Sequence, residues 1–160
     1  MGLFTPKITK DQLAYTQRVY KQVLDCTALV NTTTSAKTFL GRLNMLLDCL
    51  LELQKFEKYK IFKGKKTPSK DYQRIIDNLE LIVDRFLDRA IAENERERRC
   101  LQTDRAKENN YEKFVTNLYW DFKEAKTFWP GNGIYPHYVG SLLTQKNANR
   151  IRAMYDSVQK

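Results

Sequence analysis

Glycine, proline, histidine and cysteine are all scarce in this sequence, which has six Gly, four Pro, three Cys and one His among 160 residues. With 42% apolar residues as well, it has the composition of a globular chain and not of a disordered one. Cys26, Cys49 and Cys100 are odd in number and far apart, so they fit neither a disulfide framework nor the Cys-x-x-Cys pairs of a zinc site. We expect all of these thiols to be reduced.

Long apolar runs are also lacking. The densest apolar stretch, residues 40–53, contains Arg42, Asp48 and Glu52, so we expect no transmembrane segment. The first residues contain no apolar run long enough for a signal peptide, and Pro6 stands where a myristoylation signal needs Ser or Thr. Together these absences predict a cytoplasmic protein.

Groups that commonly catalyse reactions or hold metals are few. His137, the only histidine, has no Cys, Ser or acidic residue at a recognised catalytic spacing. Carboxylates recur at helical intervals from Glu93 to Glu112, yet the Glu-x-x-His motif of carboxylate-bundle metal sites is absent. The sequence has no Gly-rich phosphate-binding loop either. We therefore expect no enzyme activity, no catalytic residues, no metal, no cofactor and no small-molecule ligand.

What the sequence has in abundance is helical periodicity. Thr9 and Gln12 form a capping-box pattern, which predicts the start of a first helix. The apolar residues that follow at helical spacing are Leu13, Val19, Val23, Leu24 and Val30. The hydroxyl-rich residues 31–35 should end this helix and cap a second one, which is apolar over much of its circumference.

A third helix is predicted to begin at Pro68, because Thr67 is a suitable cap and proline is favoured at the first helical position. Its apolar stripe stays in helical phase through the charged residues 93–110. This favours one long helix over residues 68–128, with a break at Asn109 to Tyr111 as the alternative.

These patterns predict an all-α fold, namely an antiparallel helical bundle with a long third helix and a short C-terminal helix folding back on residues 111–128. Residues 1–92 would form a three-helix bundle. Residues 93–160 would add a charged helical extension, an aromatic turn and the C-terminal helix. We expect the two segments to form one structural unit overall.

Five short segments form a pattern between residues 25 and 92, namely Val30-Asn31-Thr32-Thr33-Thr34, Phe39-Leu40-Gly41-Arg42-Leu43, Leu53-Gln54-Lys55-Phe56-Glu57-Lys58-Tyr59, Thr67-Pro68-Ser69 and Asp84-Arg85-Phe86-Leu87-Asp88-Arg89. Through these segments, about residues 25–92 resemble uncharacterised helical proteins of Firmicutes and their mobile elements. The resemblance implies a helical fold and a bacterial host of that class, and it implies no activity.

A long third helix would carry its apolar stripe beyond the bundle, where it needs a cover. We therefore expect a non-catalytic protein-protein interaction or scaffold module, whose partner is a second copy or another protein. The residues expected at this interface are Leu101, Tyr111, Val115, Leu118, Phe122 and Trp129.

The turn before the third helix suggests a different function. Residues 1–71 contain 13 basic and 6 acidic residues, and the net charge of the chain is +9. Lysines can hold phosphates by counterion release while an aromatic ring stacks on a base, and lysine in place of arginine disfavours base-specific reading. The alternative is thus a sequence-nonspecific nucleic-acid-binding protein that uses Lys55, Lys58, Tyr59, Lys63, Lys65, Lys66 and Lys70. The simpler interpretation, which the pattern favours, is a lysine-rich tip that only keeps the protein soluble, with its aromatic rings in the core.

Overall fold

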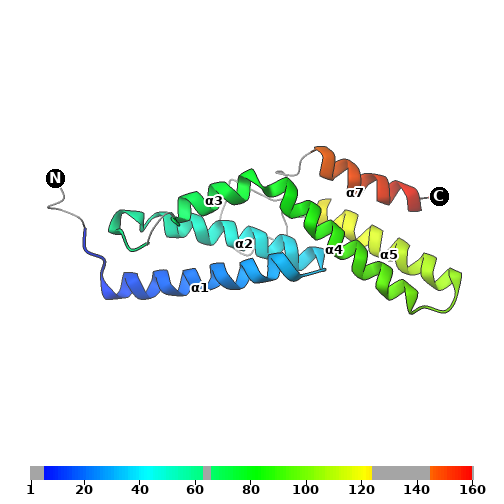
Figure 1. The fold of residues 1–160 in the computed structure, drawn as a ribbon, viewed down its shortest axis with the longest axis horizontal. Helices are drawn as coiled ribbons and strands as arrows, with labels where there is room; N and C mark the ends of the chain where they lie inside the picture. Colours follow the sequence, from blue (N-terminus) through cyan, green and yellow to red (C-terminus); the bar gives the residue numbers. More distant parts are fainter. Residues whose placement is uncertain (1–5, 63–65, 124–144, 160) are drawn as a thin grey trace.

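The computed structural model describes residues 6–62, 66–123 and 145–159, and all the regular secondary structure in these residues is helical (Figure 1). The elements are α1 (Lys10–Thr32), α2 (Ala36–Gln54), the short 3-10 helix η2 (Glu57–Tyr59), α3 (Pro68–Asp77), α4 (Leu79–Arg99), α5 (Asp104–Lys123) and α7 (Gln145–Val158). The prediction of an all-α helical bundle is confirmed. None of the helices in the described ranges combines the length and the apolar character needed to cross a membrane.

Helix starts follow the local capping signals. The Thr9 hydroxyl accepts a hydrogen bond from the Gln12 amide while the Gln12 side chain accepts one from the Thr9 amide, so the predicted capping box is confirmed. Ser35 caps α2 in the same way, and Thr67 caps α3 with proline at its first position. These short-range hydrogen bonds satisfy backbone amides that a helix leaves without partners at its N-terminus.

The expected long third helix is wrong, because residues 68–123 form three helices. α3 ends at Asp77, where the Asn78 side chain donates to the Arg74 carbonyl at 2.7 Å and so competes with the helical backbone pattern. After a bend at this point the chain continues as α4. The prediction that apolar phase alone would carry one helix through this region took no account of the asparagine.

A second interruption lies at the far tip of the molecule. α4 ends at Arg99, and Thr103 then caps α5 by accepting a hydrogen bond from the Ala106 amide. The alternative break at Asn109 to Tyr111 is also wrong, since these residues lie inside α5. Asn110 accepts instead from the Asn94 side chain at 2.8 Å, and this bond ties α5 to α4.

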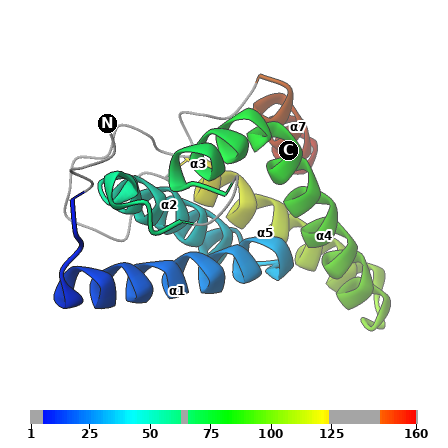
Figure 2. The ribbon, with the colours of Figure 1, turned by 60° about the vertical axis from the view of Figure 1, so that its left-hand side comes forward.

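The reversal at the tip brings α5 back against α4 and α2 (Figure 2). Three phenylalanine rings meet there, with centroid distances of 4.3 Å for Phe39–Phe86, 6.0 Å for Phe86–Phe122 and 6.4 Å for Phe39–Phe122. The hydrophobic core is one cluster that includes side chains before and after residue 92. Folding back removes the need for another molecule to cover the stripe of α5.

α7 completes the cover over α5. Ile151 is buried, and the rings of Tyr155 and Tyr119 stack at 3.9 Å. Arg150 pairs with Asp84 and Asp88 on α4, at 3.5 and 2.6 Å. The predicted return of the C-terminal helix is confirmed for residues 111–123, and residues 124–128 lie outside the described part.

Candidate functional site

The interface predicted on the third helix is largely internal. Val115, Leu118 and Phe122 are only 1%, 3% and 3% exposed, so their assignment to a surface interface is wrong. α4, α2 and α7 cover them, because the chain reverses at the tip and the C-terminal helix returns. Leu101 and Tyr111 are half-buried, and the remaining predicted interface residue, Trp129, lies outside the described residues.

Tyr111 itself makes an internal contact. The Arg98 guanidinium, on α4, lies 4.7 Å from the centre of its ring. This cation–π contact joins the two helices near the tip. The ring is therefore already engaged within the chain.

An apolar face does remain open, and it lies on α1. Leu13, Tyr20 and Leu24 are 37%, 47% and 54% exposed. Steps of seven and four residues return to the same side of a helix, so these side chains share one face. The buried stripe of α1 lies about a quarter turn away and includes Val19 and Val23.

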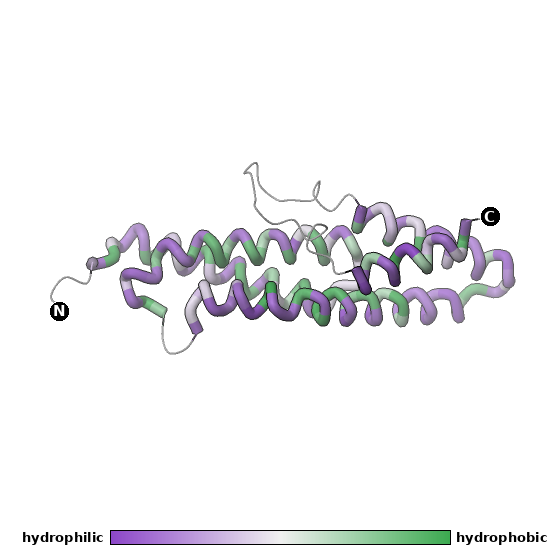
Figure 3. The backbone as a smooth tube through the Cα atoms, turned by 90° about the horizontal axis from the view of Figure 1, so that it is seen from above, coloured by the Kyte–Doolittle hydropathy of each residue, from purple (hydrophilic) through white to green (hydrophobic). Residues whose placement is uncertain are grey.

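Leu13 and Leu24 belong to the same apolar run in the sequence as Val19 and Val23, yet they lie outside the buried stripe. Leu13 and Leu24 lie about a quarter turn around the helix from Val19 and Val23. This angular difference was the signal in the sequence that could have distinguished the exposed face of α1 from the buried one. Hydrophobic residues do recur along the whole of α1, the helix next to the N label in Figure 3. Only those on the inner stripe find partners in the core.

The open face of α1 lines a groove with a volume of about 520 Å³. Lys60 has a positive φ of 55°, which ends η2 in the left-handed conformation. The two residues after it, Ile61 and Phe62, form the opposite wall. The described residues that line the groove are Leu13, Thr16, Gln17, Tyr20, Lys21, Leu24, Ile61, Phe62 and Lys66. The groove is thus mainly apolar, and the charged side chains that line it in the described part of the chain are lysines.

A second hollow, of about 210 Å³, follows on the same side of α1. It lies between α1, α2 and the start of the α3–α4 segment, and its lining includes Thr27 of α1 and Ile75 of α3. Its charged residues, Asp71 and Arg74, pair with each other at 2.6 Å. The surface beside α1 therefore changes from positive near η2 to neutral farther along.

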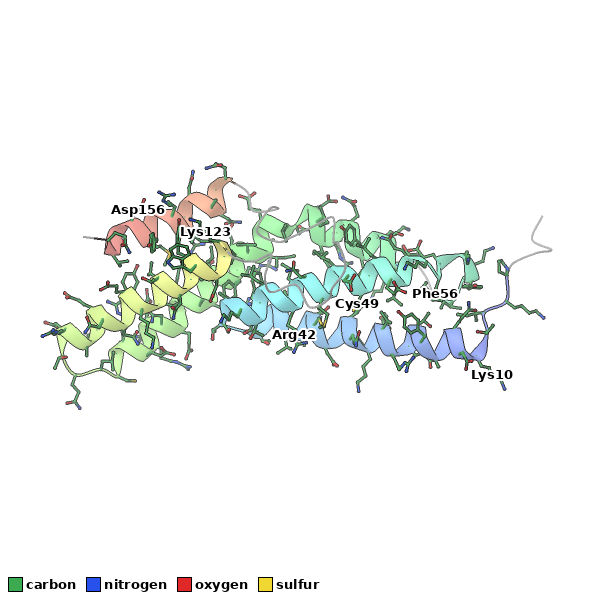
Figure 4. All side chains as sticks on the ribbon, turned by 180° about the vertical axis from the view of Figure 1, so that it is seen from behind. Lys10, Arg42, Cys49, Phe56, Lys123 and Asp156 are labelled. Atoms are coloured by element: carbon green, nitrogen blue, oxygen red, sulfur yellow. The ribbon has the colours of Figure 1, made fainter. Side chains whose placement is uncertain are left out.

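The predicted lysine cluster lies at one end of the bundle. Lys10 and Phe56 mark this end in Figure 4, and the Gln12 side chain donates to the Tyr59 hydroxyl at 3.3 Å across it. The exposed lysines of the cluster in the described residues are Lys55, Lys58, Lys66 and Lys70, while Lys63 and Lys65 lie outside these residues. α1 and α3 both begin here, and helix N-termini carry a positive partial charge.

Two carboxylates at this lysine-rich end, Glu52 and Glu57, have hydrogen-bond partners within the chain. Glu52 accepts from Lys55 at 2.8 Å and from the Tyr15 hydroxyl at 3.0 Å. The hydrogen bond from Lys55 lowers the pKa of Glu52, although partial burial opposes the shift. Glu57 accepts from the Ser69 amide at 2.7 Å at the start of α3. These contacts leave most of the lysine charge available to an external anion.

Tyr59, the predicted stacking residue, is half-buried. Its ring packs beside Phe56 at 6.1 Å, and the Lys58 ammonium lies 5.3 Å from its centre. Phe56 in turn packs against Tyr15 at 5.9 Å. These aromatic rings complete the packing at this end, and the exposed aromatic ring nearby is Tyr20.

The thiols and carboxylates of the described residues form no obvious chemical centre. No group of three or more His, Cys, Asp or Glu side chains in these residues is placed to hold a metal ion. Cys49 is buried, and burial raises its pKa to about 12. A thiol with such a pKa is a poor nucleophile near neutral pH.

Comparison of the chain with protein-family models, with curated proteins and with solved structures finds no match. The resemblance of residues 25–92 to helical proteins of Firmicutes therefore stays a prediction. The groove along α1 and the lysine-rich end are the two surface features that bear on function.

Proposed function

We propose that this protein is a non-catalytic protein-binding module whose binding surface is the groove along α1. The observation that carries the proposal is the exposure of Leu13, Tyr20 and Leu24 on a single face that lines this groove. Large apolar side chains gathered on one surface are typical of protein interaction sites. Because about half of each side chain is already buried, covering the rest against a partner would contribute about 1 kcal/mol for each.

The groove is held by well-anchored elements. α1 has a capping box at its N-terminus. At its C-terminus the Arg89 guanidinium donates to the carbonyls of Val30 and Thr33, at 2.7 and 3.2 Å. A rigid binding surface loses little conformational entropy when a partner docks. Tyr20 supplies an amphipathic ring of the kind enriched among residues that dominate binding energy.

A displayed library of random peptides tests the proposal. Peptides selected on the full-length protein should lose at least about tenfold in affinity for a Tyr20→Ser/Leu24→Ser variant. The control is Leu29→Ser, because Leu29 is 38% exposed on α1 and does not line the groove. If every selected peptide binds both variants as tightly as the wild type, the groove is not a protein-binding surface.

A second candidate function, nonspecific nucleic-acid binding, is favoured by the lysine-rich end. Its support is the pairing of Glu52 and Glu57 within the chain, next to the N-termini of α1 and α3. Such a site attracts phosphates mainly through release of counterions. The half-buried Tyr59 favours contact with the backbone of the nucleic acid over stacking on its bases.

Salt-dependent binding of a single-stranded oligonucleotide tests this candidate. Lys58→Glu/Lys66→Glu/Lys70→Glu should weaken binding strongly and lower the slope of log K against log salt by about 2. Arg99→Glu/Arg105→Glu/Lys113→Glu makes the same change in net charge at the other end of the molecule. Equal losses in both triple variants would show that only the overall charge matters and would reject a lysine-rich site.

A further inference from the structure

We infer that the occupant of the groove is an acidic amphipathic helix of a partner protein, about three turns long. This inference rests on the proposed protein-binding function and adds the chemistry of the partner. It is carried by the charge of the groove, by its length and by the polar groups that its lining offers.

The charge of the lining has one sign. Among the described residues that line the groove, Lys21 and Lys66 are the charged ones, and both are exposed. Asp or Glu residues along the edges of a bound helix would lie beside these ammonium groups. At such partly exposed positions, complementary charges contribute more to partner choice and association rate than to affinity.

The length of the groove sets the length of the helix. Leu13 and Leu24 are 11 residues apart, which corresponds to about 16 Å along α1. A helix of three turns spans this distance and presents apolar residues at positions i, i+3 or i+4, and i+7. These residues would contact Tyr20 from one side and the wall formed by Ile61 and Phe62 from the other.

The described lining of the groove offers few hydrogen-bond partners to the backbone of a bound peptide. The Thr16 hydroxyl already donates to the Leu13 carbonyl at 2.7 Å, which leaves Gln17 and the Tyr20 hydroxyl as the other uncharged polar side chains of the described lining. A peptide in extended conformation would therefore place many backbone groups against an apolar surface without hydrogen-bond partners, which is costly. A helix satisfies these groups internally, so the groove favours a helical ligand.

A second copy of this chain fits the groove less well. A two-fold symmetric contact would bring Lys21 and Lys66 of both copies together, in a protein with a net charge of +9. Farther along α1, the charges of Asp71 and Arg74 neutralise each other. The acidic residues of the partner should accordingly lie over the groove, beside Lys21 and Lys66, and not over the second hollow.

Fluorescence anisotropy with three labelled peptides of about 16 residues tests the inference on the full-length protein. One is an amphipathic helix with leucines on one face and glutamates along its edges. The second has lysine at every glutamate position, and the third has the composition of the first in an order that scatters the leucines around the helix. We expect the acidic helix to bind at least about tenfold more tightly than either of the others.

Two variants test whether the acidic helix binds in the groove and whether the lysines of the groove select its charge. Tyr20→Ser/Leu24→Ser should abolish binding of the acidic helix, and Lys21→Glu/Lys66→Glu should reverse the preference toward the lysine peptide. Arg105→Glu/Lys113→Glu is the control, because it changes the net charge equally at the far tip. Its affinity for the acidic helix should stay within about twofold of the wild type.

Each contrary outcome overturns the inference in a distinct way. Equal binding of the lysine peptide rejects the acidic partner, and equal binding of the scattered peptide rejects the helix. If none of the three binds while the random library yields peptides that depend on Tyr20 and Leu24, the inference fails and the proposed function stands. If light scattering finds a dimer that Tyr20→Ser/Leu24→Ser dissociates, the occupant is a second copy.

Discussion

α5 and α1 have similar apolar patterns, but the apolar face of α5 is buried whereas that of α1 is partly exposed. In α5, Val115, Leu118 and Phe122 are almost completely buried, whereas Tyr20 and Leu24 of α1 are about half exposed. The difference does not lie in the residue types, since both faces contain aliphatic and aromatic side chains at helical spacing. The difference lies in the packing of other helices on these faces. α7 packs on α5, whereas no described helix covers the groove beside α1.

The two faces should therefore serve different purposes. Burial of the α5 face stabilises the fold, because three helices meet over it around Phe39, Phe86 and Phe122. The face of α1 adds little to stability, because a separate stripe on the same helix already packs in the core. Substitutions that test stability and binding separately can break or sharpen this comparison.

The largest effect is expected for Phe122→Ala, which should lower the free energy of unfolding by about 3 to 5 kcal/mol. The side chain is 3% exposed, and its removal leaves a cavity beside two other rings. Leu24→Ala should change stability by no more than about 0.5 kcal/mol. Urea titration measures both, and equal losses would mean that the two faces are equivalent.

A smaller effect is expected for Arg89→Ala, at about 2 kcal/mol. This substitution removes the hydrogen bonds to Val30 and Thr33 that tie the end of α1 to α4. Arg89→Lys keeps the charge but not the planar fork, so it should recover part of the loss. Arg85→Ala is the control, since Arg85 is exposed on the same helix. Thermal and urea unfolding that rank Arg85→Ala with Arg89→Ala would contradict this role.

Weakening the contact between α7 and α4 should lower the free energy of unfolding by less still. Arg150→Ala removes the pairs with Asp84 and Asp88, whose side chains are 21% and 69% exposed. Such partly exposed pairs contribute about 1 kcal/mol or less, and salt weakens them further. Hydrogen exchange in α5 and α7 should quicken in this variant and, for the wild type, at high salt. Arg152→Ala, which affects only a pair within α7, should leave the exchange of α5 unchanged.

The next prediction involves no change in stability and concerns how fast each thiol reacts in the folded protein. Cys100 is exposed, while Cys26 and Cys49 are buried. A thiol reagent at pH 8 should label one cysteine rapidly in the folded protein and the other two only after unfolding. Rapid labelling of more than one site would contradict the buried positions of Cys26 and Cys49.

At alkaline pH, ionisation of the buried Cys49 thiol should lower the stability of the fold. Burial raises the pKa of Cys49 from 9.0 to about 12, so the folded state favours its neutral form. This contribution to stability is complete below about pH 9 and is lost as pH rises toward 12. Urea titrations from pH 8 to 11 should therefore show a smaller decline for Cys49→Ala than for the wild type, and parallel declines would contradict the shift.

Much of the local structure was predictable, because its causes lie within a few residues. Thr9 and Gln12, Ser35, and Thr67 with Pro68 form hydrogen bonds or conformations that define helix starts whatever surrounds them. The lysine cluster was visible for the same reason. Its electrostatic surroundings were not predictable, since only the structure pairs Glu52 and Glu57 and brings two helix N-termini to the same end.

By itself, then, the sequence determined the helical class, the capped helix starts and the excess of lysine near η2. The tertiary structure alone decided that the chain reverses between Arg99 and Asp104 and that α7 returns over Leu118 and Phe122. It also decided that Leu13 and Leu24 stay uncovered. The physical reason is that helical periodicity marks the side chains that gain from burial, whereas contacts between distant segments determine which of them obtain it.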